Sequence, residues 1–169
     1  YTAQSYMDYG MYEEAIKWNK TYLGLKNTWI EEVFEAQMRI SLCMMRINSY
    51  TTEEIIDEME KAIAIFPDRA EPHMRLGRYL NSIGQHHAAY QYLKQAQEMN
   101  LDAVNKLDEH LHRQAKEMQT RADHLSADDP EYQRKNDYWQ ERIGKHRSEI
   151  QEEREKLQSE IVNRPEPVV

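Results

Sequence analysis

The stretch "RLGRYLNSIGQHHAAYQYLKQAQ", residues 75–97, has the pattern of two helices joined by a glycine turn. Leu76 and Leu80 lie about one helical turn apart and share a face, and Gly77 beside them leaves room for a second helix. Gly84 is typical of the residue that follows a helix end. The stretch therefore predicts a helix–turn–helix unit. In the second helix, small and apolar residues recur at a spacing of three and four residues, which places Ala89, Leu93 and Ala96 on one face.

The same spacing occurs elsewhere in the chain, in residues 6–18 and 40–67. Pro67 and Leu101, which end two of the units, are 34 residues apart. Helix pairs that repeat about every 34 residues are typical of tetratricopeptide repeats. We therefore expect an all-α, tetratricopeptide-like helix-pair solenoid of about two and a half repeats over residues 1–101. The matching residues, 74 positions apart, are Gly10 and Gly84, Tyr12 and His86, and Ala15 and Ala89.

The middle unit, residues 40–67, keeps the apolar periodicity but has no glycine at its turn. The sequence "NSYTTEE" (48–54) stands there instead, and Thr52, with Glu54 nearby, is the predicted N-cap of the next helix. Residues 23–32 are expected to form a loop that absorbs an insertion between the first two units. The residues predicted to face the core of the middle unit are Ile40, Met44, Ile55, Met59 and Ala62.

Composition supports the helical prediction. Glycine and proline contribute only 5 residues each, while Glu, Gln, Met, Leu, Lys and Arg, which favour helices, are abundant. No apolar run approaches the roughly 20 residues that cross a membrane, and the chain does not open with a signal segment. We therefore expect no membrane span and a cytoplasmic location. The net charge of −8 and the lack of a Lys/Arg cluster disfavour nucleic acid as a partner.

The first residues already follow the helical pattern. The helical stretch "AQSYMDYGMYEEAIKW" (3–18) begins almost at the first residue, Tyr1, and the chain does not begin with methionine. We expect the chain to be a piece of a longer protein, or to lack its own start, with the first turn of the first helix upstream. A solenoid cut at that point exposes an apolar end, which a further segment would cover.

Several stretches of the first hundred residues resemble the helical repeat region that follows the catalytic domain of many bacterial and viral family-2-type glycosyltransferases. The resemblance covers roughly residues 1–100, and its most specific part is the turn "FPDRAEP" (66–72). That family continues with a Pro-rich extended stretch, whereas "NLDAVNKLDEHL" (100–111) continues here as helix. The other resembling stretches are "YTAQSYMDYGMYEEAIKWNKTYL" (1–23), "WIEEVFEAQMRISLC" (29–43) and "AAYQYLKQA" (88–96).

We expect a non-catalytic helical-repeat module that docks a partner protein or peptide, or the adjacent catalytic domain. The resemblance implies that this module accompanies a glycosyltransferase. Two alternatives remain at this point. In the first, the module is a structural scaffold that oligomerises through its C-terminal segment. In the second, it is the acceptor-binding part of a glycosyltransferase active site.

Beyond residue 101 the pattern changes to two long amphipathic segments. The first ends near "SADDP" (126–130), where Asp129 is the predicted N-cap and Pro130 the first residue of the second helix. The apolar stripes are narrow and flanked by charges, so residues 102–163 are predicted to form an antiparallel helical hairpin, with a flexible tail at 164–169. The stripes comprise Val104, Leu107, Leu111, Ala115, Met118, Ala122 and Leu125 in the first segment, and Tyr132, Trp139, Ile143, His146, Ile150, Leu157 and Ile161 in the second.

So narrow a hairpin buries little apolar surface by itself. We expect it either to cap the last repeat or to pair with another chain, which would make a homo-oligomer through residues 102–163. Gly144 weakens its second helix by roughly 1 kcal/mol relative to alanine.

Residues that carry chemistry are few and scattered. Cys43, the single cysteine, lies in the apolar run "ISLCMMRI" (40–47) and is predicted to be a buried thiol without a catalytic histidine. The 7 histidines show no metal-ligand spacing, and His73 is expected to pack in the core. The D-x-D pair of the resembled glycosyltransferases is absent, as are nucleotide-binding glycine loops. We therefore expect no catalytic residue, metal or cofactor in this segment, whatever reaction the parent protein performs.

In solenoids of this kind, the first helix of each pair lines a concave groove that binds partners. The candidate partner-binding residues are Met7, Met38, Leu42, Met45, Met74, Arg78 and Asn81, and Gln4, Asp8, Glu35, Arg46 and Glu71 share their face. Four methionines on one face suit a surface that accepts varied apolar partners. The alternative is that these residues pack against neighbouring repeats or against the hairpin.

Overall fold

The computed structural model describes residues 2–124 and 129–167, and all of their regular secondary structure is helical. The prediction of an all-α chain is therefore confirmed for this part. Tyr1, the side chain of Ala122, Leu125, positions 126–128 of the predicted break, and Val168 and Val169 of the predicted tail lie outside the described residues. The helices are α1 (Ala3–Asp8), α2 (Tyr12–Leu23), α3 (Ile30–Met44), α4 (Thr52–Ile65), α5 (Ala70–Ser82), α6 (His86–His124) and α7 (Pro130–Asn163).

The described residues form two compact units. The first comprises residues up to Ala96 together with 166–167, and the second comprises Gln97–Pro165. Helix α6 contributes its first turns to the first unit and the remainder to the second.

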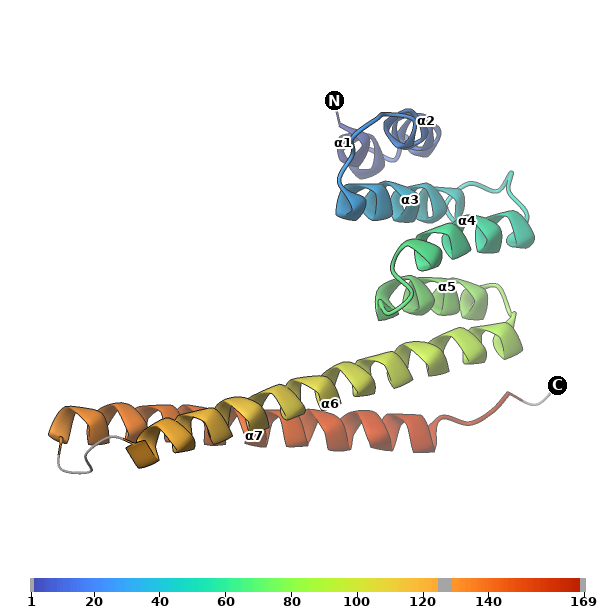
Figure 1. Cartoon of the computed structure of the whole chain (residues 1–169). Coiled ribbons are helices and arrows are strands. Elements are labelled where there is room, and N and C mark those ends of the chain that lie inside the picture. The colour runs from blue at the N-terminus through green and yellow to red at the C-terminus, as the bar shows by residue number, and fades with distance from the viewer. Residues whose placement is uncertain (1, 125–128, 168–169) are drawn as a thin grey trace. The chain divides into compact units, whose positions relative to one another are not determined.

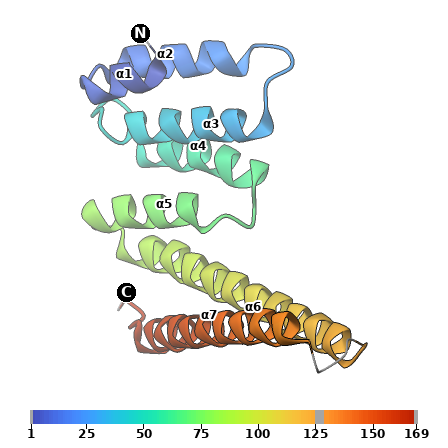
Figure 2. The ribbon, with the colours of Figure 1, turned by 90° about the vertical axis from the view of Figure 1, so that its left-hand side faces the viewer.

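Neighbouring helices of the first unit pack on one another in chain order, from α1 to α5 (Figure 1). Figure 2 shows α3 and α4 side by side, with the short α1 beside α2. Apolar side chains of these helices, together with Ala89 of α6, form two buried clusters, which include every core residue predicted for the middle unit. One holds Phe34, Met38, Met59, Ala62, Leu76, Leu80 and Ala89, and the other holds Ala15, Ile16, Ile40, Cys43, Met44 and Ile55.

The turns that follow α1 and α5 have the same backbone structure. Gly10 follows α1 with φ +75°, and Gly84 follows α5 with φ +84°. After each glycine, the next backbone N–H reaches back five residues, from Met11 to the Tyr6 carbonyl and from Gln85 to the Leu80 carbonyl, both at 2.8 Å. This is the Schellman arrangement, in which a left-handed residue satisfies the last carbonyls of a helix. The predicted equivalence of the two glycines as helix-ending residues is confirmed.

The turn of the middle unit uses a side-chain cap instead. The N-cap of α4 is Thr51, one residue before the predicted Thr52. The Thr51 hydroxyl accepts a bond from the Glu54 N–H, and the Glu54 carboxylate accepts one from the Thr51 N–H at 2.8 Å. This reciprocal capping box needs a spacing of three residues, which Thr51 has and Thr52 lacks. The loop predicted at 23–32 is also shorter, because α3 begins at Ile30.

The turn between α4 and α5 is held by a guanidinium placed between two aromatic rings. The central carbon of Arg69 lies 4.2 Å from the centroid of Phe66 and 4.7 Å from that of Phe34. The two rings meet edge to face at 5.4 Å. One turn later, His73 is 5% exposed, which confirms that it packs in the core. Its Nδ1 lies 3.3 Å from the Arg69 carbonyl oxygen.

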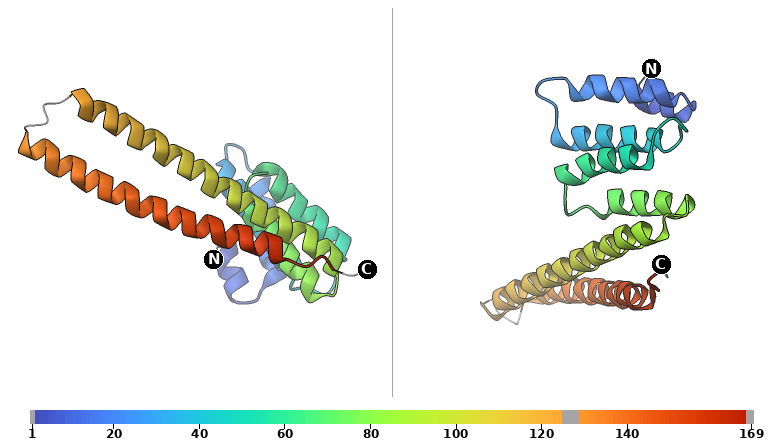
Figure 3. Two further views of the ribbon diagram at one scale, coloured as in Figure 1. Left: turned by 90° about the horizontal axis from the view of Figure 1, so that it is seen from below. Right: turned by 90° about the vertical axis from the view of Figure 1, so that its right-hand side faces the viewer.

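The second unit is an antiparallel pair formed by α6 and α7 (Figure 3). As predicted, Asp129 caps α7 by accepting a bond from the Glu131 N–H at 2.9 Å, and Pro130 opens the helix. The predicted stripe residues that become buried here are Leu111, Ile143, Ile150 and Leu157.

Polar groups also join the two helices of the hairpin. Arg154 of α7 donates to Asp108 Oδ2 at 2.6 Å and to Asn105 Oδ1 at 2.8 Å, both on α6. Arg164, just after α7, donates to Gln97 Oε1 at 2.8 Å. These bonds fix the register of the hairpin, because each joins residues far apart in sequence.

Candidate partner-binding groove

A groove of about 620 Å³ lies in the first unit, between α1, the C-terminal end of α3, and α5. Its lining comes mainly from α1, from the C-terminal end of α3 and from α5. Seven residues that were predicted for this face line it: Gln4, Met7, Asp8, Leu42, Met45, Arg46 and Arg78. These seven side chains, predicted to share a face, thus lie together in one groove.

The floor of the groove is apolar. Met7, Leu42 and Met45 are half-buried, and all three pack against the buried clusters beneath them. Because their outer atoms stay accessible, they offer an adaptable apolar surface to a ligand.

The rim of the groove is cationic. Arg46, Arg75 and Arg78 line it, against the single carboxylate of Asp8. Arg75 lies 3.5 Å from the Glu71 carboxylate in an exposed ion pair, which is weak in water. Arg46 and Arg78 have no ion-pair partner among the described residues, so their guanidinium groups are available to an anionic ligand.

Other predicted residues lie elsewhere. Met38 is 3% exposed and belongs to the core, because its position on α3 faces α4 and α5 rather than solvent. Asn81 is exposed, with its Oδ1 2.8 Å from His86 Nδ1. Met74 is half-buried and, like the exposed Glu71, does not line this groove. Glu35 lines a smaller hollow beside Arg39.

Several lining residues were not predicted from the sequence. Arg75, Tyr79 and Ser82 lie on α5 together with the predicted Arg78, and a helical projection of that segment places them on adjacent turns. Tyr12 opens α2 just after the turn at Gly10, and Ile83 follows α5 just before Gly84. No periodicity identifies such turn residues, because their direction depends on the glycine turns at residues 10 and 84.

The described residues contain no group of three or more His, Cys, Asp or Glu side chains placed to hold a metal ion. Cys43 is fully buried, as predicted, and burial raises the pKa of its thiol to about 11. Within the described part, no helix combines the length and apolarity needed to cross a membrane. No protein-family model, curated protein or solved structure matches the chain.

Proposed function

We propose that the chain is a non-catalytic interaction module of tetratricopeptide-like helix pairs, working in the cytoplasm, whose groove holds an acidic peptide segment of a partner protein. The observation that carries the proposal is the composition of the groove, with half-buried Met7, Leu42 and Met45 beneath Arg46 and Arg78. Neither arginine has an ion-pair partner within the described part of the chain. Apolar contact supplies affinity, and the arginines select carboxylates because their guanidinium groups can donate two parallel hydrogen bonds.

The repeat architecture is supported by the recurrence of one turn structure at Gly10 and Gly84 and by the packing of each helix on the next. Three successive first helices present a continuous surface only when the pairs repeat with a constant rotation. A repeat with a constant rotation between helix pairs would therefore produce a groove lined by α1, α3 and α5.

A labelled peptide of Glu, Leu and Pro residues tests the proposal, because its prolines keep it extended. Fluorescence anisotropy with the whole chain should show saturable binding. Arg46→Glu with Arg78→Glu should weaken it by about tenfold or more, since each reversal replaces attraction with repulsion. The matched control is Lys17→Glu with Lys26→Glu, two exposed lysines outside the groove.

Equal weakening by the control pair would mean that only overall charge matters, and would contradict the proposal. So would equal binding of a peptide in which lysine replaces glutamate. Circular dichroism of each variant checks that the helices persist, which is expected because all four positions are exposed.

We further propose, from the sequence resemblance of residues 1–100, that this module accompanies the catalytic domain of a family-2-type glycosyltransferase. The reading frame upstream of residue 1 tests this second proposal. A preceding α/β domain with a D-x-D motif would support it, whereas an upstream segment without such a domain would contradict it.

A further inference from the structure

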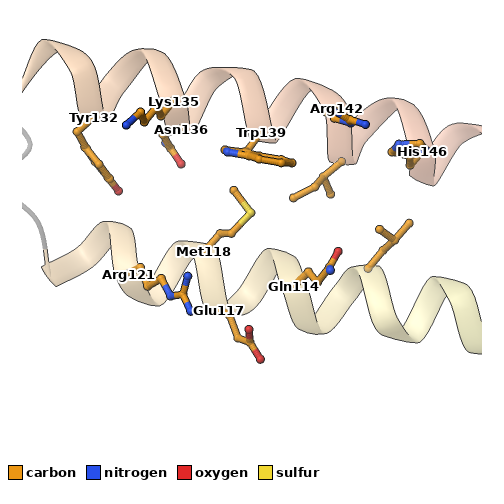
Figure 4. A pocket seen from close by; sticks show the side chains of 12 residues that line it. Gln114, Glu117, Met118, Arg121, Tyr132, Lys135, Asn136, Trp139, Arg142 and His146 are labelled. Atoms are coloured by element: carbon orange, nitrogen blue, oxygen red, sulfur yellow. The ribbon is translucent and has the colours of Figure 1, made fainter.

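A second groove, of about 630 Å³, lies within the hairpin, between α6 and α7 near the end where the two helices are joined. Figure 4 shows Trp139 of α7 and Met118 of α6 projecting toward each other across it. Leu111 and Ile143, both buried, line the groove as well. The interior of the hairpin is therefore buried at Leu111 and Ile143 but remains accessible to solvent at Trp139.

Trp139 is the large apolar group left uncovered in this groove. The Trp139 side chain is 45% exposed, although its position in the apolar stripe of α7 faces α6. The hydrophobic free energy of an indole grows with the apolar area that is removed from water. The two helices alone do not cover it, so a further apolar side chain can add contact here.

The charge around Trp139 is positive, although the chain carries a net charge of −8. Arg121, Lys135 and Arg142 line the groove, against the single carboxylate of Glu117. Lys135 also lies 3.2 Å from the Glu131 carboxylate in an exposed ion pair, which is weak in water. Arg142 lies over the Trp139 ring, with its central carbon 5.8 Å from the ring centroid. Arg121 has no ion-pair partner among the described residues.

A buried hydroxyl adds to this polarity. Tyr132 Oη is buried and has no hydrogen-bond partner in the described part of the chain. It lines the same groove, at the end nearest the connection between the helices. A phenolic O–H donates a proton, so an acceptor brought by an occupant would satisfy a group that is otherwise costly to leave unpaired.

The length of the groove defines the kind of ligand. Its lining runs from Leu111 to Arg121 on α6 and from Tyr132 to His146 on α7. At 1.5 Å per residue these spans are about 15 and 21 Å, the length of a helix of about 10 to 14 residues. An amphipathic helix of that length places apolar side chains one turn apart along a trough between two helices.

We propose that the groove between α6 and α7 docks an acidic amphipathic helix of a partner protein, whose apolar side chains cover Trp139 and Met118 and whose carboxylates meet Arg121, Lys135 and Arg142. A second copy of the hairpin fits less well. In a two-fold dimer the same surface faces itself, so one cationic groove lining would face another.

The test uses the whole chain with Trp18→Phe and Trp29→Phe, which leaves Trp139 as the only one of the 3 tryptophans. The probe is a synthetic helical peptide of about 14 residues, without aromatic residues, with leucine on one face and glutamate on the other. Its addition should shift the Trp139 emission to shorter wavelength in a saturable way, because the indole leaves water.

Arg121→Glu with Lys135→Glu should weaken this binding about tenfold or more, while Lys116→Glu with Lys145→Glu, the same charge change at exposed sites outside the groove, should have little effect. Arg121→Gln with Lys135→Gln repeats the test without introducing repulsion. Equal binding of a peptide carrying lysine for glutamate, or equal weakening by the control pair, would overturn the proposal. A dimer by light scattering whose Trp139 emission depends on protein concentration would also overturn it, in favour of a second copy as occupant.

Discussion

Leu93 occupies the space that a side chain at Gly77 would need. A Cβ atom at residue 77 of α5 would lie 2.6 Å from Leu93 Cγ and 2.9 Å from its Cδ2, both on α6. It would also lie 3.2 Å from the backbone oxygen of Ala89. The close approach predicted for Gly77 is therefore confirmed, and it depends on the backbone of α6 as well as on one flexible side chain.

Gly77→Ala is expected to lower the free energy of unfolding by about 1–2 kcal/mol, because the overpacking cost exceeds the gain in helix propensity. Urea unfolding followed by circular dichroism measures it. Gly144→Ala on α7 is the matched control, since a Cβ there meets nothing within 4 Å. That substitution should stabilise its helix by about 1 kcal/mol. A stabilising Gly77→Ala would show that the two helices can separate without loss.

Alanine at either turn glycine, Gly10 or Gly84, should destabilise the protein through backbone strain rather than through a steric clash. A Cβ atom added at Gly10 or Gly84 would meet no other atom within 4 Å, but both residues have a positive φ. Each substitution should lower the free energy of unfolding by about 1–2 kcal/mol, which is the cost of a Cβ in the left-handed region. Gly84→Asn should cost less, because asparagine tolerates this conformation. If alanine and asparagine at residue 84 proved equally stable in urea unfolding, the left-handed turn would not be maintained.

The thiol of Cys43 should be inert in the folded protein. It is fully buried, and its pKa of about 11 leaves little reactive thiolate near pH 8. A colorimetric thiol reagent should label it negligibly in buffer and completely in denaturant. Rapid labelling of the native chain would contradict the packing of α3 against α2 and α4.

The ion pair of the hairpin should make its stability depend on pH. The bond from the Arg154 guanidinium holds the pKa of the Asp108 carboxyl below its ordinary value of 3.8. A lowered pKa means that the folded state favours the carboxylate, so the stabilisation is present above pH 3.8 and is lost as the pH falls through the lowered pKa.

Arg154→Gln should therefore reduce the stability of the hairpin near neutral pH and lose that effect in acid. Thermal unfolding of both proteins across the acid range measures the difference. A difference that stayed constant down to the lowest pH would show that Arg154 acts through packing rather than through its charge.

Local signals in the sequence identified much of this fold. Gly84 and Asp129 were correctly predicted at helix boundaries because turn and cap geometry involves only a few adjacent residues. The cap of α4 was placed one residue late, at Thr52 instead of Thr51, since two adjacent threonines offer the same hydroxyl.

The grooves could be predicted only in part. Periodicity placed Met7 and Met38 on one face, yet Met38 is buried, because the rotation of α3 is set by its contacts with α4 and α5. The groove beside Trp139 was not predicted at all. It depends on the spacing between two helices, and the narrow apolar stripes of the sequence give no measure of that distance.

The arginines and lysine of the two grooves sit on a chain whose net charge is −8. At long range an acidic ligand is repelled by the protein as a whole, and it is attracted only once it is close to Arg78 or Arg121. Salt screens the long-range field within about 10 Å at 0.1 M. Moderate salt should therefore speed the encounter with such a ligand while it weakens the complex, so association and dissociation rates rise together.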